Sequence, residues 1–270
     1  MKKKKIIIKL INKFFSQRFR IANLTNYPLI GKIIGKLFFE EDNMYYLTKD
    51  SVIEIDQSLD LPDSYVLPSK IVEHFIEEAS FHWIMDFCIC RKSDQCEDYP
   101  IELGCLFLGE AAKDIDQELG RPVSKEEALE HVERCREAGL VHLIGRNKLD
   151  PVWLDVKPGK KLMTICNCCP CCCLWKMLPN LNHDIGDKIK RMPGVEIKVN
   201  ENCIGCGECT EVCFVDAIEI KGGSAVIAED CRGCGRCIEE CPENAINLNM
   251  DELDYHAKSI AELEESVDIS

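Results

Sequence analysis

Eight cysteines near the C-terminal end of the chain form two runs with the same spacing, C-x2-C-x2-C-x3-C. The runs are Cys203, Cys206, Cys209 and Cys213, then Cys231, Cys234, Cys237 and Cys241. Three closely spaced thiolates can bind three corners of one four-iron cluster, and the fourth cysteine lies further along the chain. Quartets of cysteine also bind structural zinc. The repeated spacing of two, two and three residues is specific to iron-sulfur clusters, so we expect iron.

The two runs resemble those of bacterial-type two-cluster ferredoxins, and the resemblance covers residues 199 to 250. In that family the fourth cysteine of each run binds the other cluster, and the module passes single electrons. The resemblance therefore implies two 4Fe-4S clusters with swapped ligands. Their ligand sets are Cys203, Cys206, Cys209 and Cys241 for one cluster, and Cys231, Cys234, Cys237 and Cys213 for the other. The second run keeps the usual Cys-Pro pair, but Phe214 follows Cys213 in the first, which leaves the rigidity of that loop open.

Glycines and apolar residues support the same assignment. The glycines between the cysteines let the loops adopt positive φ and bring backbone N–H groups close to sulfur. They are Gly205, Gly207, Gly233 and Gly235. Short strands at 195–199, 218–220, 225–228 and 246–248 would complete two pseudo-symmetric halves.

Ten more cysteines lie in two short segments further towards the N-terminus. The first segment contains Cys88, Cys90, Cys96 and Cys105, and the second contains Cys166, Cys168, Cys169, Cys171, Cys172 and Cys173. The first four thiols could hold one more 4Fe-4S cluster or a zinc ion. Adjacent cysteines point in different directions, so the six thiols of the second segment cannot all face one metal. We therefore expect a metal site shared by both segments, with free or redox-active thiols as the alternative.

Several motifs together resemble a family of uncharacterised 4Fe-4S dicluster proteins from anaerobic bacteria and archaea. The resemblance covers residues 40 to 250. The motifs that carry it are Cys88 to Arg91, Tyr99-Pro100, Gly104-Cys105-Leu106, Ala138 to His142 and Cys166 to Cys173. The resemblance implies an iron-sulfur protein with a cysteine-rich N-terminal domain, and it implies no particular substrate.

Composition narrows the cellular setting. The chain has 270 residues, of which 19 are cysteines, 46% are hydrophobic and 30% are charged. Such a chain is too long and too charged to be a small scaffold held together by disulfides. We find no secretory signal and no apolar stretch of ~20 residues that could span a membrane, so we expect a cytoplasmic protein. Residues 1 to 39 carry ten basic residues and no acid, whereas the chain has a net charge of -14. The acidic body argues against nucleic acid as a partner.

We expect an α+β fold in which a mainly helical, cysteine-rich N-terminal domain precedes a ferredoxin-like domain of short β-hairpins and helices. The segments are a basic amphipathic head (1–40), a helical middle domain (41–161), a cysteine-rich connector (162–195), the ferredoxin domain (196–250) and an acidic tail (251–270). In the middle domain we expect helices over 71–87, 110–119 and 124–139, the last capped by Ser124, and a strand over 139–145. Cys135 and the histidines, among them His74, His82 and His142, fit structural roles.

The head has a polar stripe and an apolar stripe at helical spacing within residues 1 to 20. On a helix this makes a basic amphipathic surface suited to peripheral contact with an anionic membrane or an acidic partner. The alternative is a solvated tail with a few residues packed on the body.

The sequence therefore predicts an iron-sulfur electron-transfer protein that connects a redox partner protein to an additional metal or thiol centre in the N-terminal domain. Two other interpretations remain open. One is an oxidoreductase with a catalytic metal site in that domain, and the other is a redox sensor that signals through a partner. No motif identifies a small-molecule substrate or a catalytic residue.

Overall fold

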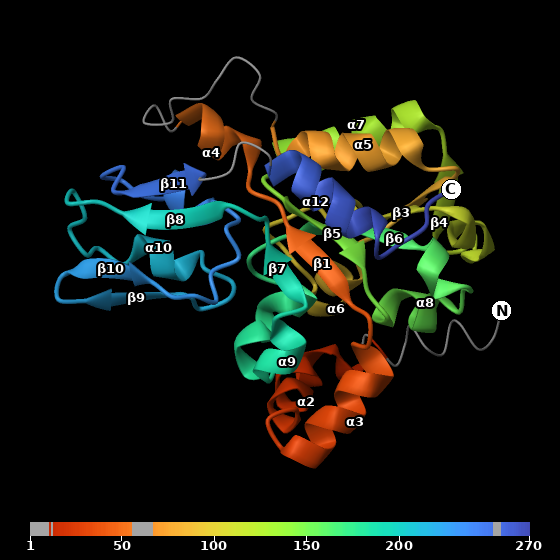
Figure 1. Ribbon diagram of the computed structural model, residues 1–270, viewed down its shortest axis with the longest axis horizontal. Coiled ribbons are helices and arrows are strands. Elements are labelled where there is room, and N and C mark those ends of the chain that lie inside the picture. The colour runs from red at the N-terminus through yellow and green to blue at the C-terminus, as the bar shows by residue number, and fades with distance from the viewer. Residues whose placement is uncertain (1–10, 12, 56–66, 251–254) are drawn as a thin grey trace.

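A seven-stranded sheet forms the centre of the molecule (Figure 1). The computed structural model describes residues 11, 13–55, 67–250 and 255–270. The strand order is β4-β2-β3-β6-β5-β1-β7, and neighbours are antiparallel except β1 and β7, which are parallel. The strands are β1 (Asn43–Tyr46), β2 (His82–Met85), β3 (Leu106–Leu108), β4 (Gly120–Val123), β5 (Val141–Arg146), β6 (Met163–Cys168) and β7 (Ile189–Arg191).

The central strand β6 carries two of the cysteines. It pairs with β3 on one side and β5 on the other, so that Ile165 lies opposite both Leu106 and Ile144. Successive residues of a strand point to opposite faces of the sheet. Cys166 and Cys168 therefore share one face, and the chain beyond the strand begins on the other.

Helices cover the sheet and close the apolar core. In Figure 1, α5 and α7 lie together along one edge of the view, and α12 crosses in front of β1 and contacts α5. The helices of this part are α2 (Arg18–Leu24), α3 (Pro28–Phe38), α4 (Asp50–Ile55), α5 (Ser69–Glu78), α6 (Ile89–Asp94), α7 (Lys125–Glu137), α8 (Leu149–Leu154), α9 (His183–Gly186) and α12 (Tyr255–Glu264). Short 3-10 helices are η1 (Phe15–Gln17), η2 (Glu110–Asp114), η3 (Gly159–Lys161) and η4 (Leu174–Asn180).

The C-terminal module extends to one side of the sheet (Figure 1). It consists of two antiparallel pairs, β8 with β11 and β9 with β10, and two one-turn helices, α10 and α11. The bounds are β8 (Val195–Val199), α10 (Glu208–Glu211), β9 (Ile218–Lys221), β10 (Ser224–Ile227), α11 (Arg236–Glu239) and β11 (Ile246–Met250). These strands lie within two residues of the predicted ones. β9 and β10 form a hairpin, whereas β8 and β11 pair the first strand of the module with its last.

Two other local predictions are also confirmed. Ser124 accepts a hydrogen bond from the Glu127 N–H, and the Glu127 side chain accepts one from the Ser124 N–H, which is the reciprocal cap expected at the start of α7. The strand predicted over 139–145 is β5.

Two helix predictions were wrong. The helix expected over 71–87 ends at Glu78, because Ala79 adopts extended backbone with ψ of 134°. The next residues form β2, whose side chains are all buried, so Trp83 belongs to a strand and not to the apolar stripe of the helix. A strand buried on both faces has no polar alternation, so its apolar residues can continue a helical pattern. The helix expected over 110–119 is only the 3-10 helix η2, which ends at Asp114.

The α+β class is confirmed, but helices do not organise the N-terminal part in the way expected from the sequence. Its central element is the seven-stranded sheet, of which the sequence predicted only one strand. The sheet also takes β6 and β7 from the segment that we described as a connector. The middle segment and the connector therefore contribute to the same core.

The described part of the basic head packs on this core. Asn182 donates from its backbone N–H to the Thr25 hydroxyl and from Nδ2 to the Thr25 carbonyl, at 2.9 and 2.8 Å. Arg18 is buried and forms an ion pair with Asp94. Residues 1–10 and 12, which carry part of the stripe predicted within residues 1 to 20, lie outside the described residues. In the described part, Phe15 is buried against the body and Phe14 is exposed. Among the residues that the structure describes, no helix is long and apolar enough to cross a membrane.

Gly145 provides a test of how tightly β1 and β5 must approach. Its φ is +142°, and a Cβ at this position would lie 2.1 Å from the Asn43 carbonyl oxygen. We expect Gly145→Ala to lower the free energy of unfolding by at least about 2 kcal/mol, through steric strain in the sheet. Anaerobic denaturant unfolding followed by circular dichroism measures this. Gly186→Ala is the control, because a Cβ there has no neighbour within 4 Å, and an equal loss in both variants would contradict the explanation.

Candidate metal centres

The C-terminal module contains two small hollows, each lined by four cysteines. We call them cage I and cage II. Cage I is lined by Cys203, Cys206, Cys209 and Cys241, and cage II is lined by Cys213, Cys231, Cys234 and Cys237. In each hollow, the fourth cysteine comes from the other run, which is the grouping that the ferredoxin resemblance implies.

Backbone geometry directs N–H groups at the cage sulfurs. All four loop glycines have positive φ, between 65° and 88°, as the sequence predicts. The Ala217 N–H donates to Cys213 Sγ at 3.3 Å, and the Ala245 N–H donates to Cys241 Sγ at 3.2 Å. These bonds are equivalent in the two runs. They stabilise negative charge on sulfur, as a thiolate-bound cluster requires.

The two cages differ in exposure and in nearby charge. Cage I is near solvent, since Cys206 and Ile204 are exposed. Cage II is lined by Arg232 and Arg236, which are only 9% and 7% exposed. Cage II therefore lies in a buried, positively charged environment, and cage I does not.

The protonation chemistry of the cages fits a bound cationic cluster. Burial raises the pKa of Cys209, Cys231 and Cys234, because a thiolate is poorly solvated inside the protein. The Ala225 N–H, in contrast, lowers the pKa of Cys203. Four thiolates facing one small hollow would repel each other unless they share a cation. The donor set, the N–H groups and the hollows all fit 4Fe-4S clusters.

A second collection of thiols surrounds β6 and the loops beside it. We call it the six-thiol group, and its members are Cys88, Cys90, Cys105, Cys166, Cys168 and Cys173. Cys105 and Cys166 have their sulfurs 3.7 Å apart. Side-chain interactions also join Cys88 to Cys90, and Cys168 to both Cys166 and Cys173. The group thus draws on both cysteine segments.

Interactions among these sulfurs give the six thiols different pKa values. A hydrogen bond from Cys90 lowers the pKa of Cys88 to about 7, and hydrogen bonds from Cys166 and Cys173 lower the pKa of Cys168. The pKa values of the donating thiols rise in return. Without a bound cation, the group would hold protons and thiolates side by side.

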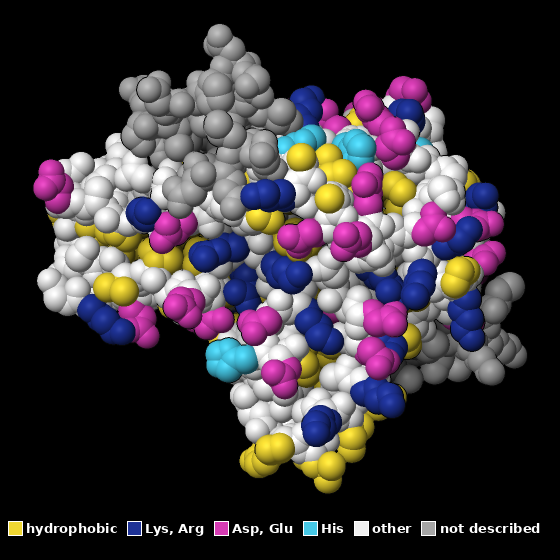
Figure 2. All heavy atoms as spheres, in the orientation of Figure 1, with side chains coloured by type: hydrophobic (Ala, Val, Ile, Leu, Met, Phe, Trp, Pro, Cys, Tyr) yellow, Lys and Arg dark blue, Asp and Glu magenta, His cyan; other side chains and the backbone are white. Residues whose placement is uncertain are grey.

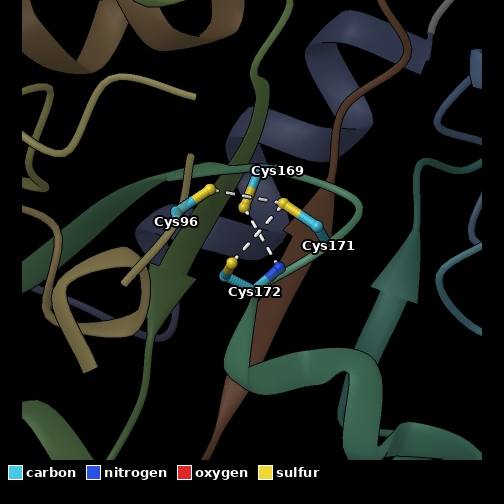
Figure 3. A group of neighbouring side chains, drawn as sticks. All are labelled: Cys96, Cys169, Cys171 and Cys172. Carbon is cyan, nitrogen blue, oxygen red and sulfur yellow. Dashed lines mark hydrogen bonds between the residues drawn. The ribbon is translucent and has the colours of Figure 1, made fainter. Parts of the chain in front are cut away.

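A third collection lies in the loop that follows β6 and at the end of α6. We call it the four-thiol group, and it consists of Cys96, Cys169, Cys171 and Cys172 (Figure 3). Its four sulfurs all lie within 4.8 Å of one another. Cys171 Sγ is 3.5 Å from the sulfurs of both Cys96 and Cys172, and the Cys172 N–H donates to Cys169 Sγ at 3.3 Å.

The neighbours Cys168 and Cys169 thus belong to different groups. Their side chains point in different directions, as the sequence analysis expected of adjacent cysteines. We considered the thiols of the first segment as one ligand set, and they do not form one group. Cys96 belongs to the four-thiol group, whereas Cys88, Cys90 and Cys105 belong to the six-thiol group. The sequence analysis expected one site that combines thiols of both cysteine segments, and the structure has two groups that do so.

Arg91 lies between the two groups and was not assigned a role from the sequence. It is fully buried, and its guanidinium donates to the carbonyls of Asn167 and Leu103. Burial lowers its pKa, but the surrounding thiols of Cys88, Cys169 and Cys105 act together in the opposite direction, and the pKa is raised. A buried guanidinium is costly unless negative charge lies beside it. Arg91 therefore indicates that thiolates face it from both groups.

The remaining candidates have structural roles. Cys135 is fully buried in apolar surroundings, as predicted. His82 hydrogen-bonds the Ile76 carbonyl, and His142 hydrogen-bonds the Asn167 amide oxygen. Asn167 also donates to the Gly104 carbonyl at 2.8 Å and so fixes the backbone beside Cys105.

Contacts between the module and the sheet were also not visible in the sequence. The rings of Tyr46 and Phe214 lie 4.8 Å apart, and the Tyr46 hydroxyl is 3.7 Å from Cys173 Sγ. Arg236 donates to the carbonyls of Gly139 and Cys168, at 3.1 and 2.7 Å. Cage II therefore faces the six-thiol group across Tyr46 and Arg236.

Comparison with known proteins supports the C-terminal assignment. Residues 196–248 match the family model of a 4Fe-4S dicluster domain. With the clustered cysteines, this supports an iron-sulfur cofactor and an electron-transfer role. No curated protein and no solved structure matches the chain significantly. The wider resemblance over residues 40 to 250 stays a prediction.

The ligand swap can be tested in the full-length protein. Because Cys213 lines cage II, Cys213→Ser should alter the same cluster signal as Cys234→Ser, even though Cys213 is closer in sequence to the cage I cysteines. Cys206→Ser gives the reference spectrum for damage to cage I. Electron paramagnetic resonance of the dithionite-reduced protein, with iron counted per chain, distinguishes the two patterns. A Cys213→Ser spectrum that matched Cys206→Ser would show that the swap does not occur.

Proposed function

We propose that this protein transfers single electrons between a redox partner and a metal centre bound by the six-thiol group, through two 4Fe-4S clusters held in cages I and II. The observation that carries the proposal is the position of Tyr46. Its ring packs on Phe214, which lines cage II, and its hydroxyl contacts Cys173 of the six-thiol group. The two centres thus have no solvent layer between them along this contact.

The interface that holds this contact is made of directed bonds. Thr48 donates from its hydroxyl to the Gly233 carbonyl at 2.8 Å, and the Lys49 N–H donates to the Cys234 carbonyl at 3.2 Å. Both acceptors lie in the second cysteine run. They fix the cage II loop to the chain directly after β1. This supports a fixed, short path for electrons and not a loosely tethered carrier domain.

The charge around the cages favours one direction of transfer. A bound cluster supplies a site that accepts and releases one electron. Around cage II, buried Arg232 and Arg236 favour the more negative, reduced state. Cage I, in contrast, is lined by the exposed Glu243, which disfavours added negative charge. We therefore propose that electrons enter at the exposed cage I and move inward to cage II.

The same surface suggests what kind of partner docks. Exposed acidic residues near cage I fit a redox protein with a basic rim around its own cofactor, because complementary charge steers such encounters. The acidic surface is unsuited to nucleic acid.

A catalytic centre is the second possibility, and the donor count weighs against it. Catalysis at iron needs a coordination position that the protein leaves open. Six thiols around one centre offer more ligands than the four corners of a cube. This surplus favours a saturated centre that relays electrons.

Iron and sulfide counts on the full-length protein test the extra centre. Purified without oxygen, the protein should contain more than about eight irons per chain, since two cubes account for eight. The double change Cys105→Ser and Cys166→Ser should return the count to about eight, while the signals of both cages persist. Cys135→Ser is the control, because that thiol belongs to neither group. Eight irons in the unchanged protein would contradict an iron-sulfur centre in the six-thiol group.

The direction of transfer can be tested by removing one buried charge. Arg236→Gln should lower the reduction potential of the cage II cluster by on the order of tens of millivolts, because the reduced state loses a stabilising positive charge. The cage I potential should stay unchanged. Lys221→Gln removes the same charge from an exposed side chain of the module and should have little effect, since water and salt screen it. A potentiometric titration followed by electron paramagnetic resonance measures both potentials, and an unchanged cage II potential would contradict the proposal.

A further inference from the structure

The four-thiol group is more compact than either ferredoxin cage. Its four sulfurs lie within 4.8 Å of one another. Four sulfurs bound tetrahedrally to one zinc ion at about 2.3 Å lie about 3.8 Å apart. The sulfur separations of 3.5 Å from Cys171 to Cys96 and to Cys172 are close to this value.

A 4Fe-4S cube needs more widely spaced ligands, because each sulfur binds a different iron. The ferredoxin cages provide an internal comparison. Among the described residues, which include all nineteen cysteines, no three sulfurs of a cage or of the six-thiol group form so compact a set. The four-thiol group therefore has the dimensions of a single-ion site, and the other groups have those of larger centres.

We propose that Cys96, Cys169, Cys171 and Cys172 bind one tetrahedral zinc ion, separate from every iron-sulfur centre. A tetrahedral site with four thiolates is typical of structural zinc. The ion would join the end of α6, where Cys96 follows the left-handed residue Gln95, to the loop after β6. That loop runs from Cys168, the last residue of β6, to Cys173, so the zinc ion would fix the segment that joins two members of the six-thiol group.

Zinc content and X-ray absorption of the full-length protein test this proposal, and neither depends on electron transfer. Protein purified without oxygen from cells supplied with iron and zinc should contain about one zinc per chain. Absorption at the zinc edge should show four sulfur neighbours at about 2.3 Å. Absence of zinc, or a shell containing nitrogen or oxygen, would overturn the proposal.

The neighbouring cysteines give a matched pair of variants. Cys96→Ser with Cys169→Ser should remove the zinc and leave sulfide unchanged, whereas Cys105→Ser with Cys168→Ser should leave the zinc in place. If sulfide falls in the first variant, the four thiols belong to a cluster and the proposal fails. Unchanged iron and sulfide in the second variant would contradict the proposed centre in the six-thiol group, but not the zinc site. The absorption spectrum of the unchanged protein decides the matter if the first variant does not fold.

An independent observation concerns the outer face of α3. Leu29, Ile33 and Leu37 lie one above another at four-residue spacing and are 75%, 52% and 56% exposed. Tyr27, before the helix, is 60% exposed. Ile21 of α2 is also exposed, and Figure 2 shows hydrophobic side chains at the tip of the molecule where α2 and α3 lie.

Packing on the opposite face fixes this orientation. Gly31 and Gly35 face the body, where a Cβ at Gly31 would lie 2.1 Å from the Thr25 carbonyl oxygen and one at Gly35 would contact Ile185. Such close approach leaves no room to rotate the helix. The apolar row must therefore point outward.

The charge next to the row identifies its partner. Lys32 and Lys36 lie on the same helix and are exposed, and no acidic residue occurs before Glu40. Apolar side chains beside lysines are typical of helices that lie in the headgroup region of a bilayer. The net charge of -14 on the whole chain would oppose contact with an anionic surface elsewhere. We infer that α3 docks the protein on an anionic lipid bilayer.

Sedimentation with vesicles tests the docking surface in the full-length protein. Vesicles containing phosphatidylserine should bind the protein, and Leu29→Ser with Ile33→Ser should reduce the bound fraction at least about tenfold. Val152→Ser, which changes an exposed apolar residue on α8, is the control and should bind normally. Added salt should weaken binding.

Three results would overturn the inference. One is equal binding by the α3 variant. Another is loss of all binding on deletion of residues 1–10, with α3 intact, because the contact would then belong to the preceding segment. A third is dimerisation, measured by analytical ultracentrifugation, that the α3 changes abolish, because the face would then join two copies of the chain.

Discussion

A thiolate buried away from water is stable only next to positive charge, and this constraint organises most of the molecule. Fourteen of the cysteines fall into the two cages and the six-thiol group, and four more form the four-thiol group. Each collection is accompanied by donors or cations: N–H groups at the cages, arginines at cage II, and Arg91 between the groups of the N-terminal part. Bound metal would supply the remaining charge. Arg91 and Arg236 are thus best understood as partners of sulfur, because neither is bonded to a carboxylate among its described contacts. Buried Arg18 and Arg232, in contrast, lie beside Asp94 and Asp230.

The two-residue period of a β-strand then decides which thiols can act together. Cys166 and Cys168 share a face of β6, and Asn167 points the other way to fix Gly104. At the end of the strand, Cys169 leaves towards Cys96 while Cys168 remains with Cys173. A run of six cysteines within eight residues therefore divides between two thiol groups that share no member. The dense sequence motif follows from one strand and one tight loop, and no larger scaffold is needed.

The sequence predicted the C-terminal module well because its signals are local. Ligand spacing, positive-φ glycines and short strands all act within about fifty residues, and each has one physical explanation. The sheet was mostly missed because its strands are short and paired across long separations. β2 is buried on both faces, so it continued the apolar stripe of α5, and the edge strands β4 and β7 are mostly exposed and too short to show an alternation. The partition of the ten thiols could be predicted only in part. Opposite directions for adjacent cysteines follow from backbone geometry, but the pairing of Cys96 with Cys171 depends on how α6 packs. Tyr46 and Arg236 gave no local signal at all, since each matters through a contact with a distant segment.

The positions of the C-terminal module and of the tip formed by α2 and α3 are consistent with their proposed roles in electron transfer and membrane binding. The C-terminal module and the tip formed by α2 and α3 project from different sides of the sheet (Figure 1). A protein held on a bilayer through α3 would therefore keep cage I accessible to a partner in solution. The two surfaces also carry opposite charge, basic on the head and acidic beside cage I. An anionic membrane would attract the first and repel the second, so charge alone would orient the module away from the lipid. Binding to a membrane and exchanging electrons with a partner can then occur at the same time, because neither surface covers the other.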